Sequence, residues 1–182
     1  CWESCSPCVA AIPGCTDSIA SNYNPIANLD NDSCLYNVTF FVDMSEVTQS
    51  FTAPEVFGQF NAWCGGCAPM TDSNNDSIWE ITIPLTVGNY EYKFAADTVN
   101  IEESLYENDN CVTTAFGYTN RTLNVIGHQV LDTVCWNRCY SCDIERNFYN
   151  VAFKIDMSNA TNSFTAPEVN GTFNNWCGNC WV

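Results

Sequence analysis

Residues 78–94 read "IWEITIPLTVGNYEYKF" and contain two short segments with the same pattern. Apolar side chains occupy every second position of both segments: Trp79, Ile81, Ile83, Leu85, Tyr90, Tyr92 and Phe94. Successive side chains of a β-strand point to opposite faces, so each segment predicts a strand with one buried face. The "VGN" between the segments is a turn signal. We therefore expect two neighbouring strands that share a core.

The chain contains a long internal repeat. Residues 37–69 align without a gap with residues 150–182, and 21 of the 33 aligned pairs are identical, so both are copies of one module. A second repeat matches "CWESCSPC" at residues 1–8 to "CWNRCYSC" at residues 135–142. These matches predict the end of a preceding repeat at 1–8, a spacer at 9–35, a complete module at 36–142, a linker at 143–149 and the first part of a following module at 150–182.

The repeat also indicates which side chains are buried. In "VTFFVDM" and its copy "VAFKIDM", alternate positions stay apolar while Phe41 is replaced by Lys154. The apolar pairs are Val38/Val151, Phe40/Phe153 and Val42/Ile155. The copies "EVFGQF" and "EVNGTF" likewise keep Val56, Gly58 and Phe60. Both stretches therefore predict strands with a defined core face, in residues 150–158 and 168–173 as well as in the complete module.

Further alternating segments are "RTLNVI" at residues 121–126 and "QVLDTV" at residues 129–134. No segment shows the sustained 3.6-residue period of an amphipathic helix. The sequence therefore predicts an all-β fold made of immunoglobulin-like antiparallel β-sandwich repeats, with about seven or eight strands in each complete module.

The composition limits the partners and the location of the protein. Five lysines and arginines oppose 21 aspartates and glutamates, giving a formal net charge of −16, which would repel a nucleic acid or an anionic membrane. No apolar run approaches the about 18 residues that a membrane span needs. Thirteen cysteines favour an oxidising environment, so we expect an extracellular or cell-surface protein.

The cysteines divide among the predicted segments. The complete module has Cys64, Cys67, Cys111, Cys135, Cys139 and Cys142, the spacer has Cys15 and Cys34, and the flanking segments have Cys1, Cys5, Cys8, Cys177 and Cys180. We expect a Cys15–Cys34 bridge, because the spacer is too small to fold by burial alone. In the complete module we expect Cys64 or Cys67 to bridge to the group at 135–142. Four thiolates holding zinc are the alternative.

The spacer contains an oxygen-rich run formed by Asn28, Asp30, Asn31 and Asp32. Carboxylate and amide oxygens are ligands that Ca²⁺ prefers, so Asp30 and Asp32 are candidate calcium ligands. The alternative interpretation is a solvated turn cluster, since the spacing is not that of an EF-hand loop.

The stretches "VFGQFNAW" and "IWEITIPLTVGNYEYKF" resemble the starch- and glycogen-binding modules with an early-set immunoglobulin-like fold. The resemblance implies that Trp63 and Trp176 stack on glucose and that Lys93 meets sugar hydroxyls. It also implies a second stacking tryptophan just after "YKF", where this chain reads "AADTVNIEESL" and has no aromatic residue until Tyr106. Trp63 lies beside Cys64, so packing against a disulfide is its alternative role.

A second resemblance concerns the spacer and the modification signals. "GCTD…NYNP…DNDSC" in residues 14–34 resembles a short module of secreted repeat proteins from bacteria that use type IX export. Asp-Ser/Thr-aliphatic triplets, which resemble the O-glycosylation signal of such bacteria, occur at Ser18, Ser77, Thr98 and Thr133. N-glycosylation sequons occur at Asn31, Asn37, Asn75, Asn120, Asn159 and Asn170. These signals predict covalent glycans.

Catalysis is not indicated by the sequence. His128 is the only histidine, and it follows Gly127 in a predicted turn. Neither a nucleophile motif nor a carboxylate pair with a defined role is evident. We therefore expect a protein that is not an enzyme.

The sequence supports two hypotheses for function. The first is a structural subunit of an extracellular, glycosylated fibre, in which copies of the chain assemble end to end. Its predicted assembly residues are Cys1, Cys5, Cys8, Val151, Phe153, Ile155, Val169, Phe173, Cys177 and Cys180, whose apolar members need a partner. The second is an α-glucan-binding module of a secreted enzyme or adhesin. A second aromatic side chain opposite Trp63 would favour the binding module.

Overall fold

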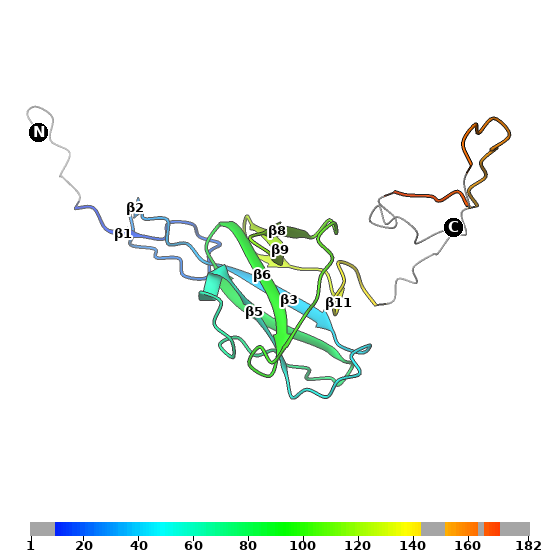
Figure 1. Cartoon of the computed structure of the whole chain (residues 1–182). Helices are drawn as coiled ribbons and strands as arrows, with labels where there is room; N and C mark the ends of the chain where they lie inside the picture. The colour runs from blue at the N-terminus through cyan, green and yellow to red at the C-terminus, as the bar shows by residue number, and fades with distance from the viewer. Residues whose placement is uncertain (1–9, 143–151, 164–165, 172–182) are drawn as a thin grey trace, which may run out of the picture. The chain divides into compact units, whose positions relative to one another are not determined.

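The structure, a computed structural model, describes residues 10–142, 152–163 and 166–171. The chain divides into two compact units, Cys1–Glu145 and Arg146–Val182. Apart from one short 3₁₀ turn, the regular elements of the described part of the first unit are strands, joined by long loops (Figure 1). Its elements are β1 (Pro13–Gly14), β2 (Leu29–Asp30), β3 (Tyr36–Asp43), β4 (Pro54–Gly58), the 3₁₀ turn η1 (Gln59–Asn61), β5 (Ile78–Leu85), β6 (Gly88–Ala96), β7 (Ile101–Glu102), β8 (Val112–Ala115), β9 (Tyr118–Val125), β10 (Gln129–Val130) and β11 (Val134–Cys135).

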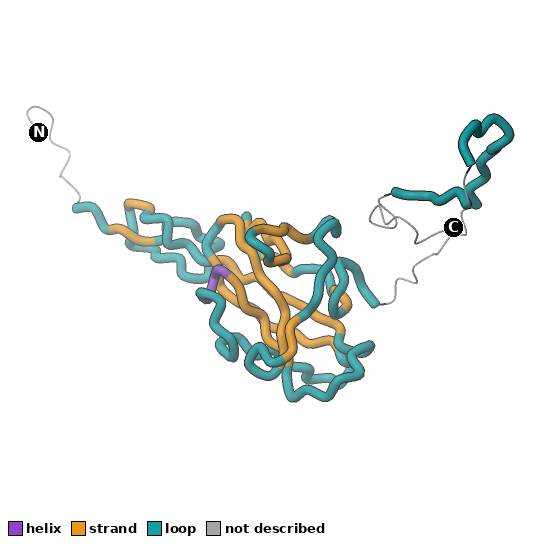
Figure 2. The backbone as a smooth tube through the Cα atoms, in the orientation of Figure 1, coloured by secondary structure: helices purple, strands orange, loops and turns teal. Residues whose placement is uncertain are grey.

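Strands β3–β11 form two sheets. The five-stranded sheet has the order β4-β6-β9-β8, with β7 also paired to β6. In the four-stranded sheet, β3 pairs with β5 on one side and with β10 and β11 on the other. Figure 2 shows the strands of both sheets in the body of this unit, with loops connecting them at its ends. None of the described residues belongs to a helix with the length and hydropathy that a membrane crossing requires.

The core lies between the sheets and comes from the alternating strands that the sequence predicts. On β3, Val38, Phe40 and Val42 are fully buried. Facing them are Tyr92 of β6 and Leu123 of β9, and the rings of Phe40 and Tyr92 lie 5.2 Å apart in an edge-to-face arrangement. Burying one such side chain stabilises the fold by about 1.5–3 kcal/mol. The predicted immunoglobulin-like β-sandwich is therefore confirmed.

One part of the sheet differs from the antiparallel prediction. The segment at 129–134 forms two short strands, β10 and β11, and both pair parallel with β3. Between them, the Leu131 N–H donates to the Thr39 carbonyl at 3.0 Å. The chain leaves the five-stranded sheet after β9 and enters the other sheet beside β3 in the same direction, so this edge is parallel.

A buried ion pair links β9 to the segment after β7. Arg121 and Glu103 are 1% and 2% exposed, and the Arg121 Nη2 lies 2.6 Å from Glu103 Oε2. The pair is fully hydrogen-bonded, because Glu103 Oε1 also accepts the Phe94 N–H at 2.9 Å and Arg121 donates to the Arg138 carbonyl at 2.8 Å. Removing one member of such a pair costs about 3–5 kcal/mol, because the other charge is left buried and unpaired.

Four disulfides join the cysteines of the described residues. They are Cys15–Cys34, Cys64–Cys67, Cys111–Cys139 and Cys135–Cys142. The first is the predicted staple of the spacer.

The predicted bridge from Cys64 or Cys67 to the group at 135–142 is wrong. Cys64 and Cys67 follow β4, whereas Cys111 precedes β8 and is bonded to Cys139. Strands β4 and β8 lie at opposite edges of the five-stranded sheet. Three strand spacings separate these edges, or roughly 14 Å, whereas a disulfide joins Cα atoms at most about 7 Å apart. Cys135 lies in β11 of the other sheet.

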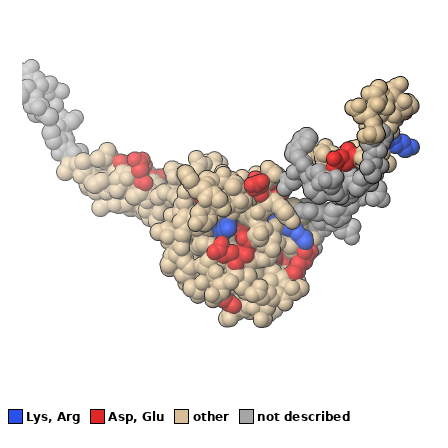
Figure 3. All heavy atoms as spheres, in the orientation of Figure 1, with Lys and Arg blue, Asp and Glu red and all other residues tan. Residues whose placement is uncertain are grey.

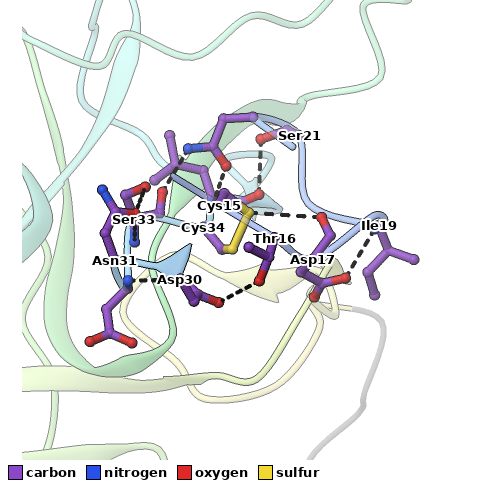
Figure 4. Close-up of a disulfide and its surroundings, with 12 residues drawn as sticks. Cys15, Thr16, Asp17, Ile19, Ser21, Asp30, Asn31, Ser33 and Cys34 are labelled. Atoms are coloured by element: carbon purple, nitrogen blue, oxygen red, sulfur yellow. Dashed lines mark hydrogen bonds between the residues drawn. A yellow bond between two sulfur atoms is a disulfide. The ribbon is translucent and has the colours of Figure 1, made fainter. Parts of the chain in front are cut away.

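The spacer packs onto the sandwich through the start of β3. Cys15, Ala20 and Tyr36 form a small buried cluster with Cys34 against it, and Figure 4 shows the disulfide with its surrounding hydrogen bonds. The Tyr36 hydroxyl donates to Asp17 Oδ2 at 2.5 Å.

His128 holds the same junction from the other side. Its Nδ1 accepts the Asn37 N–H at 2.8 Å, and its Nε2 lies 2.6 Å from the Ile19 carbonyl oxygen. An N–H can only donate and a carbonyl can only accept, so the proton is on Nε2. The histidine therefore has a structural role between spacer and sandwich.

The second unit does not show the predicted strands. Residues 152–163 and 166–171 contain no strand in the structure, although strands are predicted at 150–158 and 168–173. In the complete module the equivalent of residues 150–158 is β3, which pairs with β5 along its whole length. A strand is stabilised by a ladder with a second strand, and no such ladder is found among the described residues of this unit.

The Tyr36–Asp17 hydrogen bond yields a test of the junction. The Tyr36 hydroxyl, followed by the Ile19 N–H, lowers the pKa of Asp17 below its ordinary value of 3.8. Replacing Tyr36 with Phe should raise the pKa of Asp17 toward that value, as measured by ¹³C NMR titration of the carboxyl group. A depressed carboxyl pKa contributes stability above the unfolded-state pKa that is lost as the pH falls through the folded-state pKa. Acidification below about pH 4 should therefore destabilise the wild type more than Tyr36→Phe.

Tyr23→Phe serves as the control, because Tyr23 is an exposed tyrosine of the same spacer. An Asp17 pKa that shifts equally in both variants, or in neither, would contradict this account.

Candidate functional site

The outer face of the five-stranded sheet contains a groove of about 530 Å³. It is lined by Phe57, Gln59, Trp63, Glu91, Lys93, Glu102, Ala115, Phe116, Tyr118 and Asn120. The alternation of β6 creates the floor: Tyr90, Tyr92 and Phe94 face the core, so Glu91 and Lys93 point outward. The groove therefore brings together Trp63 and Lys93, the two described residues that the resemblance implies for sugar binding.

The segment after β4 holds Trp63 through specific backbone contacts. A Cβ atom on Gly58 would lie 2.5 Å from the Glu91 carbonyl oxygen, so only glycine allows β4 to approach β6 this closely. The Phe60 ring packs on the core. The Asn61 Oδ1 accepts the Gly58 N–H at 2.9 Å, which fixes the turn. The glycine, phenylalanine and asparagine that the two copies of the G-x-F-N-x-W stretch share thus each have a local structural role.

Trp63 is both packed and accessible. Its backbone is left-handed, with φ of 59°, and its N–H donates to the Gly58 carbonyl at 2.8 Å. The indole meets the Phe57 ring edge-to-face at 5.6 Å, yet the residue remains 38% exposed. Phe57 therefore supports one part of the indole while another part stays open to a ligand.

A buried carboxylate anchors the loop that carries Trp63. Glu55 is 2% exposed; it accepts the Val99 N–H at 2.8 Å through Oε1 and the Gly66 N–H through Oε2. Gly66 lies between Cys64 and Cys67, whose disulfide closes the loop. The loop is thereby tied to the segment after β6, which limits the positions open to the tryptophan.

The opposite wall of the groove is the tip of the β8–β9 hairpin. Phe116 and Gly117 form its two-residue turn with φ of 53° and 84°, as a type I′ turn requires. Phe116 is fully exposed and Tyr118 is 68% exposed. These two aromatic residues were not among the predicted site residues. The signal that could have found them is "AFGY", in which a glycine turn between two strands places aromatic side chains at an exposed tip.

The floor between the aromatic walls is polar and ordered. Lys93 Nζ lies 3.4 Å from Glu102 Oε2. Asn120 donates from Nδ2 to Glu91 Oε2 at 2.8 Å, and the Glu91 N–H donates to Gln59 Oε1 at 2.8 Å. These groups offer donors and acceptors already oriented by one another. Aromatic surface beside convergent polar groups is an arrangement typical of small-ligand sites.

The predicted glycosylation residues differ in accessibility. Ser18 and Thr98 are exposed, whereas Ser77 and Thr133 are partly buried. Asn31, Asn37, Asn75, Asn159 and Asn170 are exposed. Asn120 is only 7% exposed, and its amide already donates to Glu91 in the groove floor, so a glycan there would have to displace that bond. Glycosylation stays a prediction at the other positions.

Several predicted residues lie outside the described part of the chain. These are Trp176, Cys1, Cys5, Cys8, Val151, Phe173, Cys177 and Cys180. Of the remaining predicted assembly residues, Phe153 and Ile155 are 60% and 70% exposed, and Val169 is partly buried.

The oxygen-rich run of the spacer is engaged in its own loop. Asp30 accepts the Thr16 hydroxyl at 3.1 Å, a contact that Figure 4 shows, and the Asp32 N–H at 2.9 Å. Asn28 and Asn31 make further hydrogen bonds within the spacer. Calcium binding here stays a prediction. Zinc is not favoured, because the eight cysteines of the described residues are all paired in disulfides.

Comparison with known proteins supports the resemblance to a carbohydrate-binding module. Residues 51–111 match the family model for carbohydrate-binding module 48, described as the isoamylase N-terminal domain. This segment runs from just before β4 to just before β8 and includes Trp63, Lys93 and Glu102. The matched segment is a part of the chain, and the spacer lies outside it.

Two further comparisons complete this result. No curated protein matches the chain significantly. Among solved structures, a glycoside hydrolase family 15 glucoamylase from Hypocrea jecorina is similar, with a TM-score of 0.42 and 23% sequence identity. That similarity covers 57% of this chain and 17% of the glucoamylase chain. The likeness of the spacer to modules of type IX-exported proteins stays a prediction.

The close approach at Gly58 yields a second test. Gly58→Ala should destabilise the module by about 1–3 kcal/mol, because the added methyl group meets the backbone of β6. The measurement is the melting temperature by circular dichroism. Gly127→Ala is the matched control, since a Cβ there meets nothing within 4 Å. Equal melting temperatures for the two variants would show that the strand approach at Gly58 is not the constraint we describe.

Proposed function

We propose that the sandwich module binds neutral α-glucan chains in the groove between Trp63 and the β8–β9 hairpin. The observation that carries the proposal is the presence of accessible aromatic side chains on both walls of a groove with a polar floor. The match of residues 51–111 to carbohydrate-binding module 48 supports glucan as the ligand class.

The chemistry of a glucose unit suits this arrangement. A pyranose ring has apolar faces of C–H groups and a rim of hydroxyls, so it can stack on an aromatic ring and hydrogen-bond at its edge. Trp63 provides one platform, and Phe116 with Tyr118 provides the other. The Lys93 ammonium donates to hydroxyl oxygens, and the carboxylates of Glu91 and Glu102 accept from hydroxyl protons.

Charge favours a neutral ligand over an acidic one. The groove carries two carboxylates and one ammonium, within a chain of net charge −16. Figure 3 shows more acidic than basic side chains on the face in view. A polysaccharide of uronic acids or sulfated sugars would be repelled during approach.

The location that we propose is extracellular or at the cell surface. Four disulfides in the described residues support it, because such bonds persist in oxidising surroundings. The role that we propose is binding and not catalysis, as part of a secreted enzyme or adhesin.

The fibre hypothesis receives no comparable support. The comparisons match a carbohydrate-binding module, and the aromatic residues opposite Trp63 meet the criterion that favours the binding module. Assembly into a homopolymer therefore stays a prediction.

The proposal is tested by titrating the chain with maltoheptaose in an isothermal calorimeter. Trp63→Ala should weaken binding by at least about fivefold, since truncating an aromatic anchor at the centre of a binding site costs about 1 kcal/mol or more. Phe116→Ala should weaken binding several-fold. Tyr106→Ala is the control, because Tyr106 is 70% exposed but does not line the groove. Absence of wild-type binding at millimolar maltoheptaose, or unchanged affinity of Trp63→Ala, would reject the proposal.

A further inference from the structure

A second hollow lies on the outer face of the same sheet. Its volume is about 420 Å³. It is lined by Gln59, Asn89, Tyr90, Glu91, Thr113, Thr122, Leu123 and Asn124. Gln59 and Glu91 also line the groove that contains Trp63. The two hollows therefore share a boundary.

The strands make this face continuous. Along β6 the outward side chains are Lys93, Glu91 and Asn89, which alternate with the core residues. Outward neighbours on one strand are two residues apart, so Lys93 and Asn89 lie roughly 13 Å apart along the sheet. On β9 the matching row includes Asn124, which pairs with Asn89, and Thr122, which pairs with Glu91. A polar track thus leads from the groove into the second hollow.

The second hollow offers hydrogen bonds in place of aromatic platforms. Asn89 and Asn124 are exposed, and no hydrogen bond of their side-chain amides is found in the part of the chain that the structure describes. Tyr90 turns its ring to the core and bonds its hydroxyl to Thr86 at 2.7 Å. The polar groups that remain are amides, hydroxyls and the Glu91 carboxylate, which match neutral sugar hydroxyls.

We propose that the second hollow is an extension subsite, in which a neutral glucan chain anchored between Trp63 and Phe116 continues along β6 and β9. The inference rests on the proposed function and adds to it. Asn89 and Asn124 are the residues that hold the added glucose units, by hydrogen bonds from their amides. The module then prefers a chain that is longer than the groove alone can hold.

Chain length is the variable that tests this inference. Calorimetric affinities are compared for maltotriose and maltoheptaose with the wild type and with the double variant Asn89→Ala/Asn124→Ala. The wild type should bind maltoheptaose about tenfold more tightly than maltotriose, as expected for a few added hydrogen bonds. The double variant should bind maltotriose within about twofold of the wild-type affinity. It should lose most of the additional affinity for maltoheptaose. Asn110→Ala, an exposed asparagine outside both hollows, should behave as the wild type.

The outcomes separate the inference from the proposed function. If the wild type shows no gain with chain length, or if the double variant weakens both ligands equally, the extension subsite is wrong while Trp63-dependent binding still stands. If Trp63→Ala leaves binding unchanged or nothing binds, the proposed function fails and the inference with it. A direct readout is the side-chain amide NMR signals of Asn89 and Asn124, which should shift with maltoheptaose and not with maltotriose.

Discussion

Strand β6 is the element on which both the core and the groove depend. Because its side chains alternate between faces, Tyr92 and Phe94 pack inside the sandwich, while Lys93 and Glu91 form the floor outside. A shift in its register by one residue would exchange these roles. Gly58 permits this register, since a Cβ at its position would meet the Glu91 carbonyl oxygen and keep β4 from pairing closely with β6. Stability and recognition therefore share one constraint.

The Arg121–Glu103 pair extends the same dependence to β9. Both side chains lie on the core side, on strands and loops whose outer side carries Asn120 and Glu102 of the groove. A buried ion pair of this kind does not stabilise the fold more than well-packed apolar residues would. Its contribution to stability, however, depends strongly on the relative positions of the two side chains. The pair holds β9 next to the segment after β7. It thereby helps to position the β8–β9 hairpin, one wall of the groove, relative to Glu102 in the groove floor.

The sequence anticipated the core faces and one wall of the groove. Alternation at period two is a local property, so Val38 or Phe94 could be placed inward from the chain alone. The second wall is not predicted by the resemblance, which implies an aromatic residue just after "YKF", whereas Phe116 comes from a later hairpin. Disulfide partners depend on which sheet edge each cysteine occupies, and Cys64 and Cys111 occupy opposite edges; spacing along the chain does not contain that information.

The Cys111–Cys139 disulfide has a mechanical consequence. It encloses β8, β9, β10 and β11, and so also the hairpin with Phe116 and Tyr118. When this unit is stretched along the chain, tension passes through the sulfur–sulfur bond and bypasses the enclosed residues. These strands cannot be drawn out until that covalent bond breaks. The hairpin that carries Phe116 and Tyr118 therefore resists extension by force, whereas Trp63 and Lys93 lie outside the enclosed loop and lack this protection.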